Sequence, residues 1–291
     1  MCSSADICET IAKYALQSLL YEVSATPKPG LVDRCNQGAH QDMDFFTFMS
    51  SSAALPFYFF RCALKGLEYA AGNPVELFKE LRPLGMEAEK NMLKATGGVN
   101  THKGLLFSLG ILCAVASCCS AEQKISRPGV DSICRKVAAL TEGISHRELE
   151  VSNKTTRLTH GEILYRKYGL KGIRGEAENG FPTVRNYALP VFRNLKTLHQ
   201  YNFNDILVQV LLHLMTVTED TNVVARHDQD TLNYVKQYSS KALNVGGMFS
   251  PVGRSIVYQM DNEFIKRNIS PGGAADLLAV TIMFDLICND A

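Results

Sequence analysis

The sequence predicts an all-α fold in a single domain over residues 1–291. Its periodic segments repeat apolar residues about every 3.6 positions, and helix-capping signals stand before several of them. No segment shows the alternating pattern of a strand or an Asn-Gly hairpin signal. The chain also lacks an internal repeat, a low-complexity tract and a long linker. We therefore expect roughly ten helices around one core, joined by glycine-rich polar junctions.

Most of the expected helices have a recognisable beginning in the sequence. The first covers residues 7–23, where apolar side chains recur at helical spacing. Asp42 and Asp44 suit the start of the next, because acidic groups complement the positive end of a helix dipole. A capping box at Thr159 opens a helix that ends at Gly169. Other helix starts are expected at Asn73-Pro74, at Asn204 or Asp205, at Asp230, at Ser250-Pro251 and after Ser270-Pro271-Gly272-Gly273.

The composition is that of an ordinary globular protein, with 46% hydrophobic and 20% charged residues. Because 30 Lys and Arg face 29 Asp and Glu, no overall field attracts nucleic acid or an anionic membrane. The N-terminus lacks the pattern of a signal peptide, and the longest apolar run, Leu105 to Cys119, is shorter than a membrane span. Nine cysteines without a C-x-x-C pair indicate reduced thiols, a cytoplasmic location and no zinc site.

The stretch GGVNTHKGLLFSLG, residues 97–110, leads from polar residues directly into an apolar helix. Since the chain has neither a P-loop nor a G-x-G-x-x-G after a strand, a nucleotide would need another kind of phosphate site. A helix N-terminus is one, because its free N–H groups and its dipole attract anions. Asn100, Thr101, His102 and Lys103 therefore either face a phosphate or belong to a capped, solvated helix start. Both interpretations remain open from this segment alone.

The loop from Ser24 to His40 is expected to be non-helical, because prolines and glycines interrupt it. Lys28, Asp33 and Arg34 give it an unusual density of charged groups for a connector. The loop is either part of a site or a solvated connection.

Carboxylates gather at two later junctions. In GIRGEAENG, Glu176 and Glu178 flank one residue and follow Arg174. They either serve a divalent cation or acid–base chemistry, or form the acidic first turn of a helix. In TEDTNVVARHD, Glu219 and Asp220 follow an apolar helix with no glycine or proline between. Hard oxygen ligands there suit Mg²⁺, whereas acidic groups at a helix C-terminus would oppose its dipole.

A last junction, SPGGAADLL, puts Asp276 in the first turn of a very apolar helix. Its carboxylate either complements the helix dipole or is held rigidly in a site. Among the histidines, His213 is expected in the core and His227 at the surface.

Five junctions together resemble one family. The segments KPGLVDRCNQGAH, GGVNTHKGLLFSLG, GIRGEAENGFP, EDTNVVARH and NISPGGAADLL are similar, in order and separation, to those of the triphosphoribosyl-dephospho-coenzyme A synthases. The resemblance runs from about Glu22 to Leu278. Residues 227–229, His-Asp-Gln, depart from it, because members of the family carry glycines there. A stiffer loop after Arg226 is the expected result.

The resemblance implies a pentosyl transfer between ATP and 3′-dephospho-coenzyme A. The ribose C1′ of ATP is joined to the 2′-hydroxyl of the acceptor, adenine leaves, and the triphosphate is retained. The product is the prosthetic-group precursor for citrate lyase or malonate decarboxylase, which a second transferase attaches to an acyl carrier protein. If the family's β-to-α change at C1′ applies, the reaction is a single inverting displacement, with carboxylates near an oxocarbenium-like centre.

Carried over motif by motif, the resemblance also implies the site residues and the metal. Asp33, Glu176, Glu178 and Asp220 are the expected catalytic carboxylates, and Asp33, Glu176 and Asp220 the expected ligands of Mg²⁺. The residues expected to bind substrate are Lys28, Arg34, His40, Asn100, Thr101, His102, Lys103, Arg174, Asn222, Arg226, Ser270, Gly272, Gly273 and Asp276.

Two other functions remain open on the sequence. EDTNVVA resembles the Asp-Thr-Asp stretch of ADP-ribosylglycohydrolases, which are helical and act at ribose C1′ with Mg²⁺. A Mg²⁺-dependent hydrolase is therefore one alternative, and a non-catalytic module that binds nucleotides or coenzyme A is another. A homodimer, and the pathway that is served, also stay open.

Overall fold

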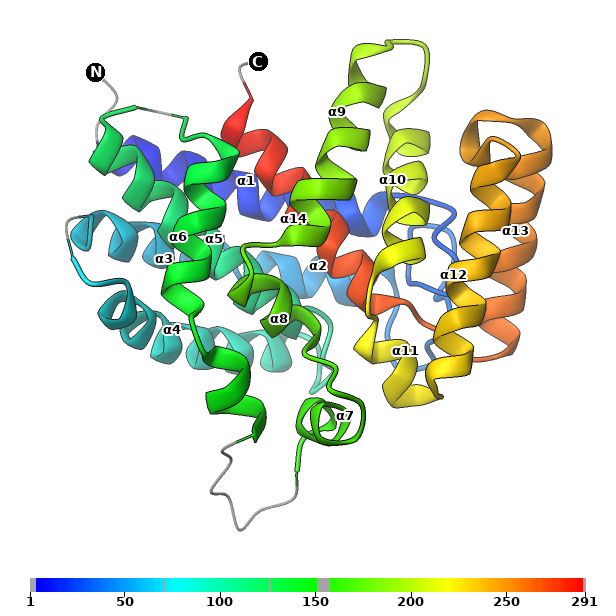
Figure 1. The fold of residues 1–291 in the computed structure, drawn as a ribbon, viewed down its shortest axis with the longest axis horizontal. Coiled ribbons are helices and arrows are strands. Elements are labelled where there is room, and N and C mark those ends of the chain that lie inside the picture. Colours follow the sequence, from blue (N-terminus) through cyan, green and yellow to red (C-terminus); the bar gives the residue numbers. More distant parts are fainter. Residues whose placement is uncertain (1–3, 71, 126, 151–157, 290–291) are drawn as a thin grey trace.

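The computed structural model describes residues 4–70, 72–125, 127–150 and 158–289. Helices account for all the regular structure of these residues, which confirms the all-α prediction (Figure 1). The elements are α1 (Ser4–Ser24), α2 (Phe45–Ala53), α3 (Pro56–Glu68), α4 (Pro74–Ala95), α5 (Lys103–Gln123), α6 (Val130–Thr141), η1 (His146–Glu150), α7 (His160–Tyr168), α8 (Gly172–Glu178), η2 (Val184–Ala188), α9 (Leu189–Thr197), α10 (Phe203–Val217), α11 (Thr221–Arg226), α12 (Gln229–Asn244), η3 (Gly247–Phe249), α13 (Pro251–Lys266) and α14 (Gly272–Cys288).

Most of the expected helix starts are confirmed. Asn73, Asp44 and Ser250 accept backbone hydrogen bonds as N-caps, and Thr159 forms a capping box with Glu162. Four starts were placed slightly late. Helix α1 begins at Ser4 and α14 at Gly272, while Asn202 caps α10 and Asp228 caps α12. The expected number of about ten helices was too low. Short helices such as α8 and α11 span fewer than two full turns of periodic pattern, so periodicity does not reveal them.

The centre of the fold is formed by α5 and α14, which are apolar on nearly all sides and mostly buried. Figure 1 shows α14 crossing the middle of the molecule, and it packs against α1, α5 and α10. Helix α3 lies close along α5, because Gly66 faces the Ala114 carbonyl and Gly110 faces the Tyr58 hydroxyl, where a Cβ would clash. This close approach holds α5 against α3. The beginnings of both core helices, α5 and α14, carry predicted site residues.

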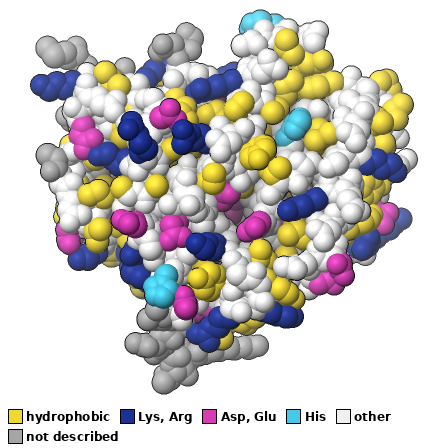
Figure 2. Space-filling view, viewed as in Figure 1, with side chains coloured by type: hydrophobic (Ala, Val, Ile, Leu, Met, Phe, Trp, Pro, Cys, Tyr) yellow, Lys and Arg dark blue, Asp and Glu magenta, His cyan; other side chains and the backbone are white. Residues whose placement is uncertain are grey.

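Helix α5 is long and apolar enough to cross a membrane, so the expectation that this apolar segment is too short for a membrane span was wrong. However, 83% of its apolar window is buried inside the fold, as in the core helix of a globular protein. The described cysteines are free thiols, as predicted. Figure 2 shows acidic and basic side chains interspersed over the visible face, in keeping with the balanced net charge.

Candidate active site

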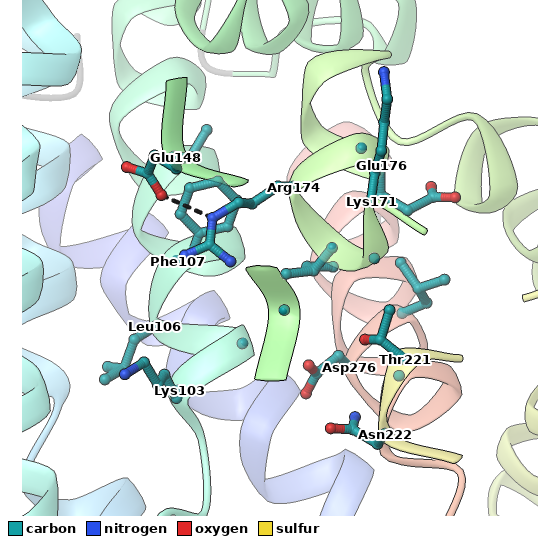
Figure 3. A pocket seen from close by; sticks show the side chains of 18 of the residues that line it. Lys103, Leu106, Phe107, Glu148, Lys171, Arg174, Glu176, Thr221, Asn222 and Asp276 are labelled. Carbon is teal, nitrogen blue, oxygen red and sulfur yellow. Dashed lines mark hydrogen bonds and ion pairs between the residues drawn. The ribbon is translucent and has the colours of Figure 1, made fainter. Parts of the chain in front are cut away.

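A cavity of about 1110 Å³ opens where α4, α5, α8, α11 and the start of α14 converge. Figure 3 shows side chains from α5, α8, α11 and α14 facing the same space, among them Lys103, Arg174, Asn222 and Asp276. A volume of this order accommodates a nucleotide-sized ligand. The cavity is therefore the candidate active site.

The beginning of α5 forms one wall of this cavity. His102 is the N-cap residue, and the Asn100 Oδ1 atom accepts a hydrogen bond from the Lys103 N–H at 3.2 Å. The Lys103 side chain is 57% exposed and pairs with Glu89 at 2.6 Å. Lys103 thus brings a cation to the wall without being buried.

His102 is buried and lies behind this wall. Its Nδ1 atom is 2.7 Å from the Ser51 Oγ atom, which also accepts a hydrogen bond from Thr101. Burial, and then the charge of Lys28, lower the pKa of His102 to about 3, so the ring is neutral near pH 7. The cost of burying a histidine is reduced because its charge is lost.

Asp220 ties two helix beginnings together. Its Oδ1 atom accepts from the Asn222 and Val223 N–H groups as the N-cap of α11, and its Oδ2 atom accepts from the Ala274 N–H of α14 at 2.9 Å. The interpretation of Asp220 as an acidic end of the preceding helix was wrong, because α10 ends at Val217 and a new helix begins. The carboxylate therefore complements a helix dipole instead of opposing it.

Asp276 faces the cavity from α14, beside the first turn of α5 (Figure 3). Its Oδ2 atom lies 2.0 Å from the position that a Cβ at Gly104 would take, so only glycine leaves room for the carboxylate. Burial raises the pKa of Asp276 well above the ordinary aspartate value, and the charges of Glu22 and Asp220 raise it further. Among the described residues, no hydrogen-bond donor engages this carboxylate.

Glu176 and Glu178 have separate environments near the end of α8. The Glu176 carboxylate lines the cavity and accepts hydrogen bonds from the backbone and hydroxyl of Thr183. Burial, and then the charge of Glu219, raise the pKa of Glu176. Glu178 is not part of the cavity wall and lies 3.3 Å from Lys171 Nζ. Because both glutamates end a helix, the alternative of an acidic first turn was wrong.

The first loop lies outside the cavity wall. Lys28 is 1% exposed and forms a buried ion pair with Glu22. The Asp33 carboxylate accepts hydrogen bonds from the N–H groups of Lys28, Cys35 and Asn36, so it shapes the turn.

Arg226 connects the rim of the cavity with the end of this loop. It hydrogen-bonds the Ala39 carbonyl and lies 3.2 Å from His40 Nδ1, while His40 Nε2 lies 2.9 Å from the Ser270 Oγ atom. Burial and the charge of Arg226 lower the pKa of His40. His227 is exposed, as predicted, and reaches the Asn268 carbonyl. His213 was predicted in the core but is only half-buried.

The structure thus divides the predicted site residues into two groups. Those on the cavity wall are Asn100, Lys103, Arg174, Glu176, Asn222, Arg226, Gly273 and Asp276. Those that do not line the cavity are Lys28, Asp33, Arg34, His40, Thr101, His102, Glu178, Asp220, Ser270 and Gly272. Several of the second group lie one layer behind the first and hold it in place.

The cavity also contains charged residues that sequence reasoning missed. They are Arg82, Glu89, Glu148 and Lys171, and Glu219 was noted only as a neighbour of Asp220. Arg82 and Glu89 lie seven residues apart on one face of α4, which is a helical spacing but not a motif. Glu148 lies in a segment without any recognisable signal.

The described residues contain no cluster of three or more His, Cys, Asp or Glu side chains suited to a metal ion. Asp33 and Asp220 give their oxygens to backbone N–H groups, so the three predicted Mg²⁺ ligands are not brought together. Glu176 and Glu219 both line the cavity, and the charge of Glu219 contributes to the raised pKa of Glu176.

The fold and the cavity define a class of protein. It is helical, and it has a nucleotide-sized cavity that is lined by cations and carboxylates and bordered by helix N-termini. The comparisons give the family. Residues 8–291 match the family model described as ATP:dephospho-CoA triphosphoribosyl transferase. The chain belongs to this family.

Named relatives and a solved structure agree with this membership. The chain is 43% identical to 2-(5''-triphosphoribosyl)-3'-dephosphocoenzyme-A synthase from Klebsiella pneumoniae, over 94% of this chain and 89% of that protein. It is 42% identical to the synthase of the same description from Escherichia fergusonii, over 93% and 88%. A crystal structure from Archaeoglobus fulgidus, provisionally assigned as such a synthase, has 16% identity and a TM-score of 0.50, covering 82% of this chain and 98% of that one. This likeness supports the fold.

Proposed function

We propose that this protein condenses ATP with 3′-dephospho-coenzyme A, releasing adenine and forming 2′-(5″-triphosphoribosyl)-3′-dephospho-coenzyme A. Family membership over nearly the whole chain is the observation that carries the proposal. The cavity supports it, because residues of four family-like motifs line one nucleotide-sized space.

Asp276 is the proposed general base. As the acceptor's 2′-oxygen bonds to C1′, its proton passes to the Asp276 carboxylate, the C1′–N9 bond breaks, and adenine leaves with the electron pair and takes up a proton. A base needs a pKa near the working pH, and burial together with two neighbouring acids raises the pKa of Asp276. Asp33 and Asp220, first expected to be catalytic, then have positioning roles through the backbone groups they bind.

Mg²⁺ is proposed to enter with ATP. In proteins this ion commonly uses one or two carboxylates together with phosphate oxygens and waters, so it does not need a closed protein cage. Glu176 and Glu219 are the wall carboxylates that fit this role, because both line the cavity and the charge of Glu219 raises the pKa of Glu176. When bound, the ion would neutralise triphosphate charge.

We also propose a cytoplasmic location, supported by the free and mostly buried thiols. The product would be passed to a transferase that modifies an acyl carrier protein, in the citrate lyase or malonate decarboxylase pathway.

One incubation tests the proposed reaction against its alternatives. The protein is mixed with ATP and Mg²⁺, with and without dephospho-coenzyme A, and the products are identified by mass spectrometry. Adenine and the condensed product, formed only with the acceptor, support the transferase. Adenine with free ribose triphosphate in the absence of acceptor indicates the hydrolase, and no turnover indicates a binding module.

A further inference from the structure

Two arginines of the cavity share one carboxylate. Glu148 Oε1 lies 2.9 Å from Arg82 Nη1, and Glu148 Oε2 lies 2.7 Å from Arg174 Nε. Figure 3 shows the Glu148–Arg174 pair at the cavity wall. The three residues come from α4, η1 and α8, and all of them line the cavity. The carboxylate thus holds two guanidinium groups from different helices beside the same space.

This arrangement differs from an ordinary surface ion pair in what it exposes to the cavity. The side chains of Arg82 and Arg174 are 61% and 35% exposed, so both keep N–H groups that Glu148 does not use. Arginine presents its donors in a planar fork that matches phosphate as well as carboxylate. Partly exposed ion pairs are weak, so an anion with more oxygens and more charge can replace the carboxylate.

The other cavity cations are less suited to this exchange. Lys103 pairs with Glu89 and Lys171 pairs with Glu178, each as a single ammonium group. Arg226 is held by a carbonyl, an amide and a histidine. Only the pair around Glu148 brings two guanidinium groups together among the described cavity residues.

We propose that Arg82 and Arg174 form a clamp for the polyphosphate chain of a substrate, with Glu148 as the exchangeable counter-ion that keeps the clamp assembled before binding. The inference rests on the proposed function, since both proposed substrates carry linked phosphates. Pre-assembly reduces the entropy lost when the phosphates bind. Glu148 also opposes binding, because the ligand must displace it.

Substitutions of the carboxylate and of the arginines should therefore have opposite effects on the affinity for polyphosphate. Isothermal titration with inorganic tripolyphosphate measures them without turnover. Glu148→Gln should lower the Kd roughly fivefold, the effect of one partly exposed ion pair. Arg82→Gln and Arg174→Gln should each raise it by about the same factor. Glu87→Gln is the matched control: Glu87 lies on α4, as Arg82 does, but it pairs with Arg61 and does not line the cavity, so the Kd should not change.

An unchanged or higher Kd in Glu148→Gln, in protein that melts like the wild type, would overturn the clamp. So would a Glu87→Gln effect as large as that of Glu148→Gln. If Glu148→Gln melts earlier, Arg174→Lys decides, because it keeps the charge and loses the fork. A Kd unchanged from the wild type contradicts the proposal, and a higher Kd supports it.

Turnover then identifies which substrate supplies the phosphates. If the clamp holds the triphosphate of ATP, Arg82→Gln should raise the KM for ATP and leave that for dephospho-coenzyme A unchanged. The reverse result assigns the clamp to the acceptor's diphosphate. Tripolyphosphate binding that follows these predictions without any adenine release would refute the proposed function while supporting the clamp.

Discussion

Replacing Gly104 by alanine should lower the activity of this protein without lowering its stability. Gly104 lies in the first turn of α5, and an added Cβ would stand 2.0 Å from the Asp276 Oδ2 atom. Ordinary contact begins near 3.4 Å, so the carboxylate must withdraw by about 1.4 Å. Because the displaced atom ends a short side chain at a cavity, it can rotate away without disturbing the backbone.

The expected loss of activity follows from this displacement. A misplacement of about 1 Å can cost on the order of 100-fold in rate, or about 2.7 kcal/mol of transition-state stabilisation. Alanine favours the helix by about 0.5–1 kcal/mol relative to glycine, so the free energy of unfolding should stay near the wild-type value or rise. The rate is measured as adenine release from ATP with dephospho-coenzyme A, and the stability by urea unfolding.

Gly161→Ala provides the control for the backbone effect. Gly161 is the second residue of α7, as Gly104 is of α5, and it also borders the cavity. Its added Cβ would meet only Leu149, at an ordinary 3.6 Å. In an Asp276→Asn background, Gly104→Ala should have little further effect, because both changes act on one carboxylate. Wild-type turnover by Gly104→Ala, or an undiminished loss in that background, would refute the reasoning.

Four further outcomes are expected. Lys28→Met should lower the free energy of unfolding by about 3–5 kcal/mol in urea, because it leaves the Glu22 carboxylate buried without its partner; an effect below about 1 kcal/mol would contradict a charged buried pair. Asp220→Ala should cost about 2–4 kcal/mol by the same measurement, because backbone N–H groups of two helices lose their acceptor, and Asp220→Asn should recover part of it. In the pH profile of kcat/KM, the acid limb should have an apparent pKa above the ordinary aspartate range, because burial raises the pKa of Asp276 and only the ionised carboxylate accepts a proton. An acid limb near pH 4 would exclude Asp276 as the base. Burial lowers the pKa of His102 from 6.5 to about 3, so between these pH values the unfolded chain binds a proton that the folded chain does not. The free energy of unfolding should therefore fall as the pH drops from about 6.5 to about 3. His102→Gln should flatten this part of the pH profile, and an unchanged slope would speak against a neutral buried ring.

The fold class and most helix positions could be predicted because their signals are local. Apolar spacing, caps at Thr159 and Ser250, and the stop at Gly169 each act within a few residues, and the structure confirms them. Where prediction failed, the local signal was short or ambiguous. The helix α11 has six residues, so its cap Asp220 was taken for the end of α10.

The candidate site was predictable only in part. Four of the five motifs contribute residues to the cavity, and eight of the predicted binding and catalytic positions line it. The sequence of these motifs does not indicate which of their side chains face the cavity. Lys28 and Asp33 look like ligand-binding groups in a loop, yet one is buried against Glu22 and the other binds backbone N–H groups.

The sequence by itself determined that this chain is helical, which family it resembles, and four of the junctions that line the cavity. Only the tertiary structure decided that Asp276 faces the cavity, that Gly104 gives it room, and that Glu148 joins Arg82 to Arg174. The physical reason is the distance along the chain over which the interactions act. Helix formation and capping depend on neighbours within about four residues. A site depends on side chains from distant segments, whose burial and mutual charge exist only after the helices pack.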